Sequence, residues 1–208
     1  MTNGKWKMTN GKRTARYDDF AQHYEGVMNP LQRWGLVGLR AETLRQLPKG
    51  RILEIGAGTG LNFIHYPPDA HGVAGEFSRE MLKIASTKTR PPGVQLLQNR
   101  AEDLPFDDSS FDGAFATLVF CSVESPAKAF KELRRVVRPG GTIVLLEHVR
   151  PNGILGPLFD LLNVATVRLF EDHVNRRTAQ TLRDAGLEVV NVKSRLFGIV
   201  NLIKCRVS

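Results

Sequence analysis

The sequence predicts an α/β fold in which helices cover both faces of a doubly wound, mostly parallel sheet. Short apolar runs of strand length alternate along the chain with amphipathic segments of helical period, which is typical of repeated βαβ units. The last two apolar runs follow each other with no helical segment between them, so we expect about seven strands with an antiparallel C-terminal strand. Such sheets bind ligands beyond the carboxyl ends of their strands.

Strands are expected where a short apolar run is bounded by turn residues. In chain order these runs cover residues 51–56, 71–77, 94–99, 107–120 (with a leading turn), 142–149, 187–193 and 199–207. Helices are expected where apolar residues recur at helical spacing between glycine and proline breakers. They cover residues 17–23, 31–47, 79–89, 126–137 and 178–186, and the turn after the first strand is expected to open another helix.

Length and composition favour one globular domain preceded by a tail. The chain has 208 residues, of which 42% are hydrophobic and 24% charged, as is ordinary for a single soluble domain. Residues 1–16 hold two copies of the polar pentamer MTNGK, so we expect a disordered tail there and a domain over 17–208. We expect neither a membrane span nor a secretory leader, because no sufficiently long apolar run occurs.

The charge is strongly basic and unevenly placed. The formal net charge is +8, and residues 1–16 contain five basic residues and no acid. Solubility alone explains this excess most simply, an anionic membrane surface is the next explanation, and nucleic acid is the last. Nucleic acid is disfavoured because the basic residues are not interleaved with aromatic ones.

Cysteine and histidine usage does not indicate a metal site or a disulfide framework. Cys121 and Cys205 are the two cysteines, so a reducing, cytoplasmic location is expected. His23, His65 and His71 have no spacing typical of metal ligands, and no metal is expected.

A glycine-rich turn, LEIGAGTG (53–60), follows the first predicted strand. Its glycines at 56, 58 and 60 allow positive φ and let a ligand approach the backbone. Glu54 lies inside the strand, and Glu76 ends the second strand, 20 residues after Gly56. An acid at that position can hydrogen-bond ribose hydroxyls, so the pattern indicates a nucleoside site.

The glycine spacing narrows the choice of nucleoside. The third glycine comes one residue earlier than in the dinucleotide pattern G-x-G-x-x-G, and no phosphate-binding G-x-x-x-x-G-K-[ST] motif is present. A nucleoside without a pyrophosphate fits better. S-adenosylmethionine is such a ligand, with ribose hydroxyls for Glu76 and a charged amino-acid tail for the turn and Glu54.

Five segments together resemble the class I S-adenosylmethionine-dependent methyltransferases. They are YDDFAQHYE (17–25), LEIGAGTG (53–60), GEFSREML (75–82), NRAEDLPFDDSSFD (99–112) and LRRVVRPGG (133–141). They occur in the order and at the spacing of that family. The resemblance implies a Rossmann-like seven-stranded fold with S-adenosylmethionine as cofactor. Glu76 departs from the family pattern, where Asp is usual, as does Arg100, where many relatives carry Asp toward the adenine.

The resemblance also implies which residues hold the cofactor. The N-terminal helix is expected to cover it, and the adenine is expected to rest on the backbone near Ala101 and on Glu102. The implied cofactor-binding residues are Tyr24, Glu54, Gly56, Ala57, Gly58, Gly60, Asn62, Glu76, Phe77, Ser78, Met81, Ala101, Glu102, Thr117 and Leu118.

A narrower resemblance concerns the methyl acceptor. NFIHYPPDA (62–70), TLVFCSV (117–123), LEHVR (146–150) and HVNRRTAQTLRDAGL (173–187) resemble a group that includes animal thiol methyltransferases. Bacterial relatives of that group are labelled phospholipid or quinone methyltransferases. We therefore expect a small or lipophilic acceptor, with a thiol, an amine and a quinol-type oxygen all open. The membrane anchor of the animal members is not expected here.

Residues after the fourth and fifth strands limit the acceptor further. Enzymes that methylate planar amides or nucleobase amines typically have N-P-P-Y or D-P-P-Y after the fourth strand, whereas this chain has TLVFCSV (117–123). The apolar insert 150–176 is expected either to pack as a core helix or to cover an acceptor pocket and touch a membrane. Cys121 is expected to be a small buried hydrophobe or else part of the pocket lining.

Methyl transfer needs positioning more than side-chain chemistry, because the sulfonium already activates the methyl group. A general base helps when the acceptor must lose a proton. His148 is our first candidate, although a purely structural role stays open. Glu147 is a second candidate or the residue that orients the site, and Asp172 and His173 are further candidates.

Two other functions stay open at this point. One is a non-catalytic module that binds S-adenosylmethionine, and the other is an RNA methyltransferase, to which the basic tail would be suited. The acceptor atom and the oligomeric state do not follow from the sequence.

Overall fold

A computed structural model describes the chain apart from residues 1–17, 19–20, 27–28, 30–34 and 149–177. Its elements are α2 (Val37–Leu44), β1 (Arg51–Ile55), η2 (Phe63–His65), β2 (His71–Glu76), α3 (Arg79–Ser86), β3 (Gly93–Gln98), β4 (Phe111–Thr117), α4 (Pro126–Val136), β5 (Val137–His148), α6 (Thr178–Asp184), β6 (Leu187–Arg195), η3 (Leu196–Gly198) and β7 (Val200–Val207). A further short helix covers residues 21–26. The predicted tail 1–16 and the insert 150–176 lie outside the described residues.

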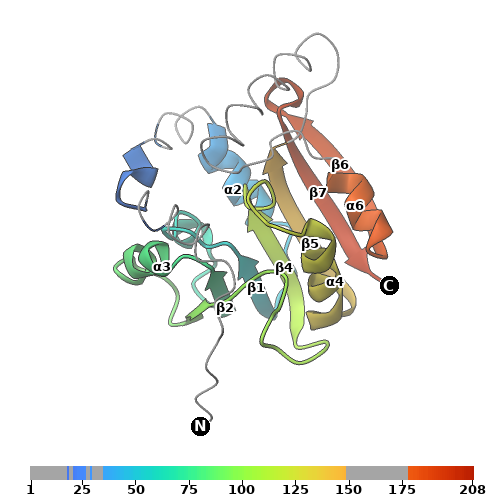
Figure 1. Ribbon diagram of the computed structural model, residues 1–208, viewed down its shortest axis with the longest axis horizontal. Helices are drawn as coiled ribbons and strands as arrows, with labels where there is room; N and C mark the ends of the chain where they lie inside the picture. The colour runs from blue at the N-terminus through green and yellow to red at the C-terminus, as the bar shows by residue number, and fades with distance from the viewer. Residues whose placement is uncertain (1–17, 19–20, 27–28, 30–34, 149–177) are drawn as a thin grey trace.

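Seven strands form one sheet in the order β3-β2-β1-β4-β5-β7-β6 (Figure 1). β1 pairs in parallel with β2 on one side and with β4 on the other. β7 runs antiparallel to both β5 and β6. The predicted doubly wound, mostly parallel, Rossmann-like sheet with an antiparallel C-terminal strand is confirmed. The strand order reverses between β1 and β4, where ligand sites form in such sheets.

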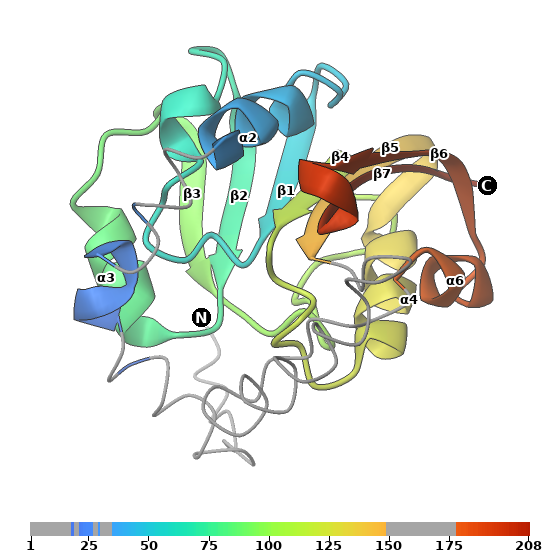
Figure 2. The same ribbon diagram turned by 90° about the horizontal axis from the view of Figure 1, so that it is seen from above.

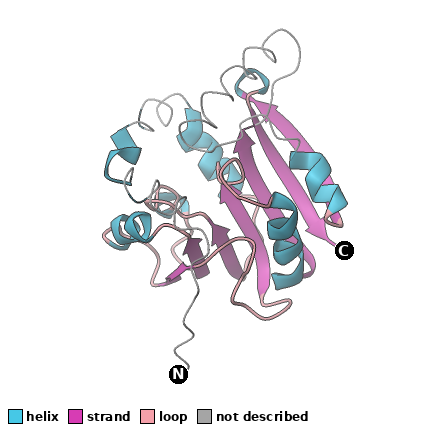
Figure 3. Cartoon of the chain, in the orientation of Figure 1, coloured by secondary structure: helices cyan, strands magenta, loops and turns pink. Residues whose placement is uncertain are grey.

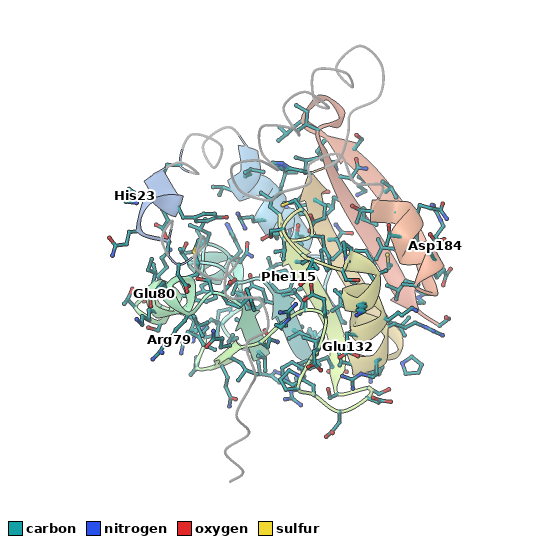
Figure 4. The ribbon with its side chains drawn as sticks, in the orientation of Figure 1. His23, Arg79, Glu80, Phe115, Glu132 and Asp184 are labelled. Atoms are coloured by element: carbon teal, nitrogen blue, oxygen red, sulfur yellow. The ribbon has the colours of Figure 1, made fainter. Side chains whose placement is uncertain are left out.

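Helices cover both faces of the sheet (Figure 2, and by element type in Figure 3). The apolar face of α4 is made by Ala129, Phe130, Leu133 and Val136 at helical spacing, and it is buried with α6 against one face of the sheet. α2 packs on the other face. Phe115, which Figure 4 labels at the centre of the sheet, belongs to that second core.

Two predicted boundaries are wrong for local reasons. The sequence predicts a helix after β1, but residues 58–62 form turns, and the 3₁₀ helix η2 follows them. Pro67 and Pro68 come directly afterwards, and proline both lacks an N–H and disfavours helical backbone in the residue before it. β5 begins at Val137 rather than at residue 142, because buried Val137 pairs with Phe111 before the register shifts.

The predicted helices are otherwise present with shorter limits. The helix expected over 31–47 is seen as α2, with turns at 45–47, and the one expected over 79–89 ends at Ser86. The helix expected over 17–23 is confirmed where it is described, since Asp18 and residues 21–26 are helical and residues 17 and 19–20 lie outside the described residues.

Candidate active site

The glycine-rich turn leaves open space at one position. Gly56, Gly58 and Gly60 have φ of 67°, 56° and 82°. A Cβ on Gly56 would lie 2.5 Å from the side chain of Val119, and one on Gly60 would lie 2.5 Å from the ring of Phe63. These two glycines therefore let the turn pack against the protein itself. A Cβ on Gly58 would meet nothing within 4 Å, so the space above it is available to a ligand.

Glu76 holds the open part of this turn from the end of β2. Its Oε2 accepts a hydrogen bond from the N–H of Gly58 at 2.8 Å, and its Oε1 accepts one from the N–H of Ser78 at 2.8 Å. Burial raises the pKa of Glu76, and the backbone hydrogen bonds oppose that rise. Each carboxylate oxygen has a further lone pair, so Glu76 can also accept hydroxyl groups of a ribose placed over Gly58.

A buried polar network lies behind the turn. Arg40, in α2, is 3% exposed and donates to Asn62 Oδ1 at 2.9 Å and to Thr117 Oγ1 at 2.6 Å. Asn62 donates to Glu54 Oε1 at 2.5 Å and to Thr117 Oγ1 at 2.9 Å. The hydroxyl of Tyr66 donates to Glu54 Oε2 at 2.7 Å. Side chains from α2, β1, β4 and the turn are thus fixed relative to one another.

The two charges in this network compensate each other. Burial lowers the pKa of Arg40, while Tyr24 and Glu54 oppose that change. Burial raises the pKa of Glu54, while Asn62, Tyr66 and Arg40 oppose that change. Glu54 is fully buried and both of its oxygens already accept hydrogen bonds, so we expect it to act on a ligand through Asn62 and Arg40 rather than by contact.

The N-terminal helix 21–26 lies beside α3 at this end of the sheet (Figure 1), and Figure 4 labels His23 on the former and Glu80 on the latter. Asp18 Oδ1 accepts hydrogen bonds from Ser78 Oγ at 2.5 Å and from the N–H of Glu80 at 3.2 Å. Glu25 forms an ion pair with Lys88. The segment that the family resemblance assigned to covering the cofactor is therefore attached next to Ser78. Ser78 also caps α3 by accepting from the N–H of Met81, which is buried.

Residues after β3 form the side of the site expected to receive adenine. The guanidinium of Arg100 lies 5.3 Å from the centre of the Phe77 ring and pairs with Glu124 at 3.1 Å. Glu102 accepts hydrogen bonds from the N–H groups of Glu124 and Ser125 at 3.0 and 3.2 Å, so its carboxylate supports the start of α4. Ala101 packs on the core beneath.

Asn99 is a further candidate that was not singled out from the sequence. It follows β3, and its N–H donates to the carbonyl of Glu76 at 3.0 Å. Within the described part of the chain its side-chain Nδ2 is buried with no hydrogen-bond partner, which is costly unless a ligand satisfies it. Asn99 and the space over Gly58 are two observations that fit a nucleoside cofactor.

The carboxyl end of β5 has a different, mostly apolar character. His148 pairs across the sheet with Val200, and burial lowers the pKa of its imidazole, which is therefore uncharged near neutral pH. Leu118, Leu196 and Ile199 pack on the apolar core that contains Val200. Leu118 and Leu196 have φ of 59° and 47°, a strained backbone that bulky residues rarely adopt and that clusters at functional sites.

Glu147, the other catalytic candidate, is 1% exposed and accepts hydrogen bonds from the N–H groups of Val119 and Phe120. Cys121 is partly exposed in the same turn after β4. Tyr17, Asp172 and His173 lie outside the described residues. Among the residues that are described, no group of three or more His, Cys, Asp or Glu side chains comes together that could hold a metal ion.

Comparisons with known proteins identify the family to which the chain belongs. Residues 53–145 match the family described as a methyltransferase domain. A solved S-adenosylmethionine-dependent methyltransferase from Thermotoga maritima aligns with a TM-score of 0.70 and 25% identity, covering 94% of this chain and 100% of that one. A demethylmenaquinone methyltransferase from Renibacterium salmoninarum is 30% identical over 79% of this chain and 70% of its own length. The chain belongs to the S-adenosylmethionine-dependent methyltransferases.

A third relative of this methyltransferase supports the narrower resemblance seen in the sequence. Human thiol S-methyltransferase TMT1B is 39% identical over 107 residues, which are 49% of this chain and 43% of the human enzyme. The acceptors in the relatives' names thus include a quinone and a thiol.

Proposed function

We propose that this methyltransferase methylates a lipophilic acceptor where the carboxyl ends of β4 and β5 meet the amino end of β7. The methylated group in this proposal is a thiol, a quinol-type oxygen or a phospholipid amine. The observation that supports this most directly is His148, an uncharged imidazole at the end of β5 that adjoins an apolar core. An uncharged imidazole can accept the proton that a thiol, a quinol or an ammonium must lose.

The cofactor fits at the neighbouring glycine-rich turn. S-adenosylmethionine, when bound, supplies a methyl group that its sulfonium has already activated for in-line transfer. Glu76 would accept the ribose hydroxyls over Gly58, and Asn99 would donate to the adenine. Arg40 places a positive charge behind the turn, where it favours the carboxylate of the amino-acid tail. Thr117 and Leu118 would line the passage from the turn to the acceptor.

The expected preference for a lipophilic acceptor follows from the small number of polar side chains on the acceptor side. Leu118, Leu196 and Ile199 offer apolar surface, and no N-P-P-Y segment is present to hold a planar amide or nucleobase. Apolar walls bind a lipophilic group by removing it from water, whereas they provide nothing for the polar contacts of a small hydrophilic amine. The relatives' quinone and thiol acceptors agree with this preference.

An acceptor panel tests the proposal. The protein and S-adenosylmethionine would be incubated separately with 1-decanethiol, a reduced demethylated quinone, phosphatidylethanolamine vesicles, ethanolamine and an RNA oligonucleotide, and S-adenosylhomocysteine release would be measured. We expect turnover with at least one of the first three and none with the last two. Turnover confined to ethanolamine or RNA would refute a lipophilic acceptor.

We also propose that the protein meets such acceptors at an anionic membrane surface from the cytoplasmic side. The basic excess, with five basic residues and no acid in residues 1–16, supports this proposal. Across the described ranges, none of the helices is both long and apolar enough to cross a bilayer. Flotation with vesicles containing anionic lipid at low salt should recover the protein with the lipid, and flotation independent of lipid charge would contradict the proposal.

A further inference from the structure

The turn after β4 is held by a side chain of the neighbouring strand. The N–H of Leu118 donates to the carbonyl of Leu146 at 2.7 Å, directly after Thr117 and Leu146, the final pair in the register of β4 and β5. The next two N–H groups, of Val119 and Phe120, donate instead to the carboxylate of Glu147, at 3.2 Å and at 3.2 to 3.3 Å. The carboxylate of Glu147 thus continues the pairing of the two strands after their backbones diverge.

This short turn contacts both halves of the site. Val119 lies against Gly56, so tightly that a Cβ on the glycine would lie 2.5 Å from the valine side chain. Leu118, with φ of 59°, packs on the apolar core that contains both Ala57 of the glycine-rich turn and Val200, the residue paired with His148. Phe120 is 1% exposed, and its ring centre lies 4.4 Å from that of Phe130. The conformation of residues 118–120 therefore sets the distance between the cofactor turn and the acceptor wall.

A strained backbone of this kind persists only when its surroundings determine it. Leucine at positive φ would relax to an extended or helical conformation if the following N–H groups were released. Glu147 supplies the restraint, because its carboxyl oxygens accept the hydrogen bonds of both following N–H groups. Its 1% exposure keeps water from competing for those N–H groups.

We infer that Glu147 is a positioning residue, which fixes the turn 118–120 so that the cofactor and acceptor pockets meet at the required distance, and that it is not the general base. A carboxylate buried to this degree and occupied by two backbone donors does not reach a proton on the acceptor. The inference rests on the proposed cofactor position at Gly58. It leaves proton removal to His148.

Substitutions at Glu147 distinguish the two roles. Glu147→Ala removes both acceptor oxygens, whereas Glu147→Gln keeps one acceptor oxygen and turns an N–H donor toward the other backbone N–H. Asp112→Asn is a matched control, because Asp112 Oδ2 accepts a hydrogen bond from the N–H of Arg51 at 2.6 Å, at the opposite ends of β1 and β4.

Two measurements would be made on the whole protein: amide hydrogen exchange at Val119 and Phe120, and calorimetric affinity for S-adenosylhomocysteine. We expect Glu147→Ala to speed exchange at both amides by roughly tenfold or more and to weaken the affinity by about tenfold. Glu147→Gln should lie between the wild type and Glu147→Ala in both measurements. Asp112→Asn should change neither.

The outcomes separate this inference from the proposed function. Unchanged exchange and unchanged affinity in Glu147→Ala would overturn the positioning role, as would a Glu147→Gln variant that loses turnover with a lipophilic acceptor while both measurements stay at wild-type values. Wild-type protein that does not bind S-adenosylhomocysteine would refute the cofactor site. The exchange measurement would still test the restraint on the turn.

Discussion

The two halves of the candidate site differ in polarity. On the β1–β2 side the cofactor turn is backed by Arg40, Glu54 and Asn62, a buried network in which each polar group has a partner. On the β5–β7 side, uncharged His148 pairs with Val200, and Leu196 and Ile199 pack on the apolar core to which Val200 belongs. The difference agrees with our proposal that one half holds a fixed, charged cofactor and that the other selects its ligand by apolar surface.

Removing the cation from the polar half should have the largest effect. Arg40→Met leaves the fully buried carboxylate of Glu54 without the nearby positive charge that offsets its burial, and an uncompensated buried charge costs about 3–5 kcal/mol of the free energy of unfolding. Urea denaturation measures this loss. The exposed ion pair Lys83–Glu80 provides the control, since Lys83→Met should cost less than about 1 kcal/mol. A double variant, Arg40→Met with Glu54→Gln, should recover part of the loss, and no recovery would contradict the charge compensation between Arg40 and Glu54.

Removing the imidazole from the apolar half should act on turnover instead. We expect His148→Gln to lower the rate with a lipophilic acceptor by about a hundredfold or more. Only the uncharged imidazole can accept a proton, and burial disfavours the charged form, so the wild-type rate should fall with acid only below the ordinary histidine pKa. A rate profile measured from acid to neutral pH checks this. A variant that keeps the wild-type rate and profile would leave His148 with a structural role.

The open space at Gly58 can be filled directly. Gly58→Val should weaken binding of S-adenosylhomocysteine by roughly a hundredfold, since even a Cβ enters the space assigned to the cofactor. Gly140→Val is the matched control. Gly140 lies in the first part of β5 and also has positive φ, and a Cβ added there would meet nothing within 4 Å. Both variants should lose about 1–2 kcal/mol of stability through backbone strain. Equal affinities in calorimetry would show that the cofactor does not lie over Gly58.

A milder change in the same half concerns the ribose. Glu76→Ala should weaken S-adenosylhomocysteine binding by about 1–3 kcal/mol, the range for losing a charged hydrogen-bond partner. The exposed carboxylate of Glu80, in the adjoining α3, serves as the control, and Glu80→Ala should bind nearly as well as the wild type. Similar affinities for the two variants would argue against a ribose contact by Glu76.

The smallest predicted effect is a difference in thiol reactivity between the two cysteines. Burial raises the pKa of Cys205 to about 12, whereas Cys121 is partly exposed in the turn after β4. A thiol reagent should therefore modify Cys121 at least about tenfold faster than Cys205 in the folded protein. Mass spectrometry of the labelled peptides measures the ratio. A faster reaction at Cys205 than at Cys121 would contradict the burial of Cys205 in the core.

The fold and the geometry of the glycine-rich turn could be predicted because their signals are local. Apolar runs, glycine spacing and the acid at the end of β2 lie within short stretches, and the structure brings Glu76 and Gly58 together as the pattern indicates. η2 could also have been foreseen from Pro67 and Pro68, which leave no room for a longer helix. The start of β5 could not, since the RPGG segment has the composition of a helix end and its pairing depends on Phe111 in another strand.

Arg40 shows what sequence patterns miss at the site itself. The helical pattern of residues 31–47 does not mark Arg40 as buried, whereas the structure buries it against Asn62 and Thr117. Its burial depends on residues 22 and 77 positions away, so helical periodicity could not reveal it. One signal was available: Glu54 inside an apolar strand requires a buried partner, because an isolated buried charge is too costly.

A crystal structure with S-adenosylhomocysteine tests the central claim most directly. The account predicts ribose hydroxyls within hydrogen-bond distance of Glu76 over Gly58, the amino-acid carboxylate directed toward Arg40, and the sulfur facing the apolar side near Leu118 and His148. A ligand with its ribose away from Glu76, or with its sulfur directed away from His148, would contradict the division of the site into a polar cofactor half and an apolar acceptor half.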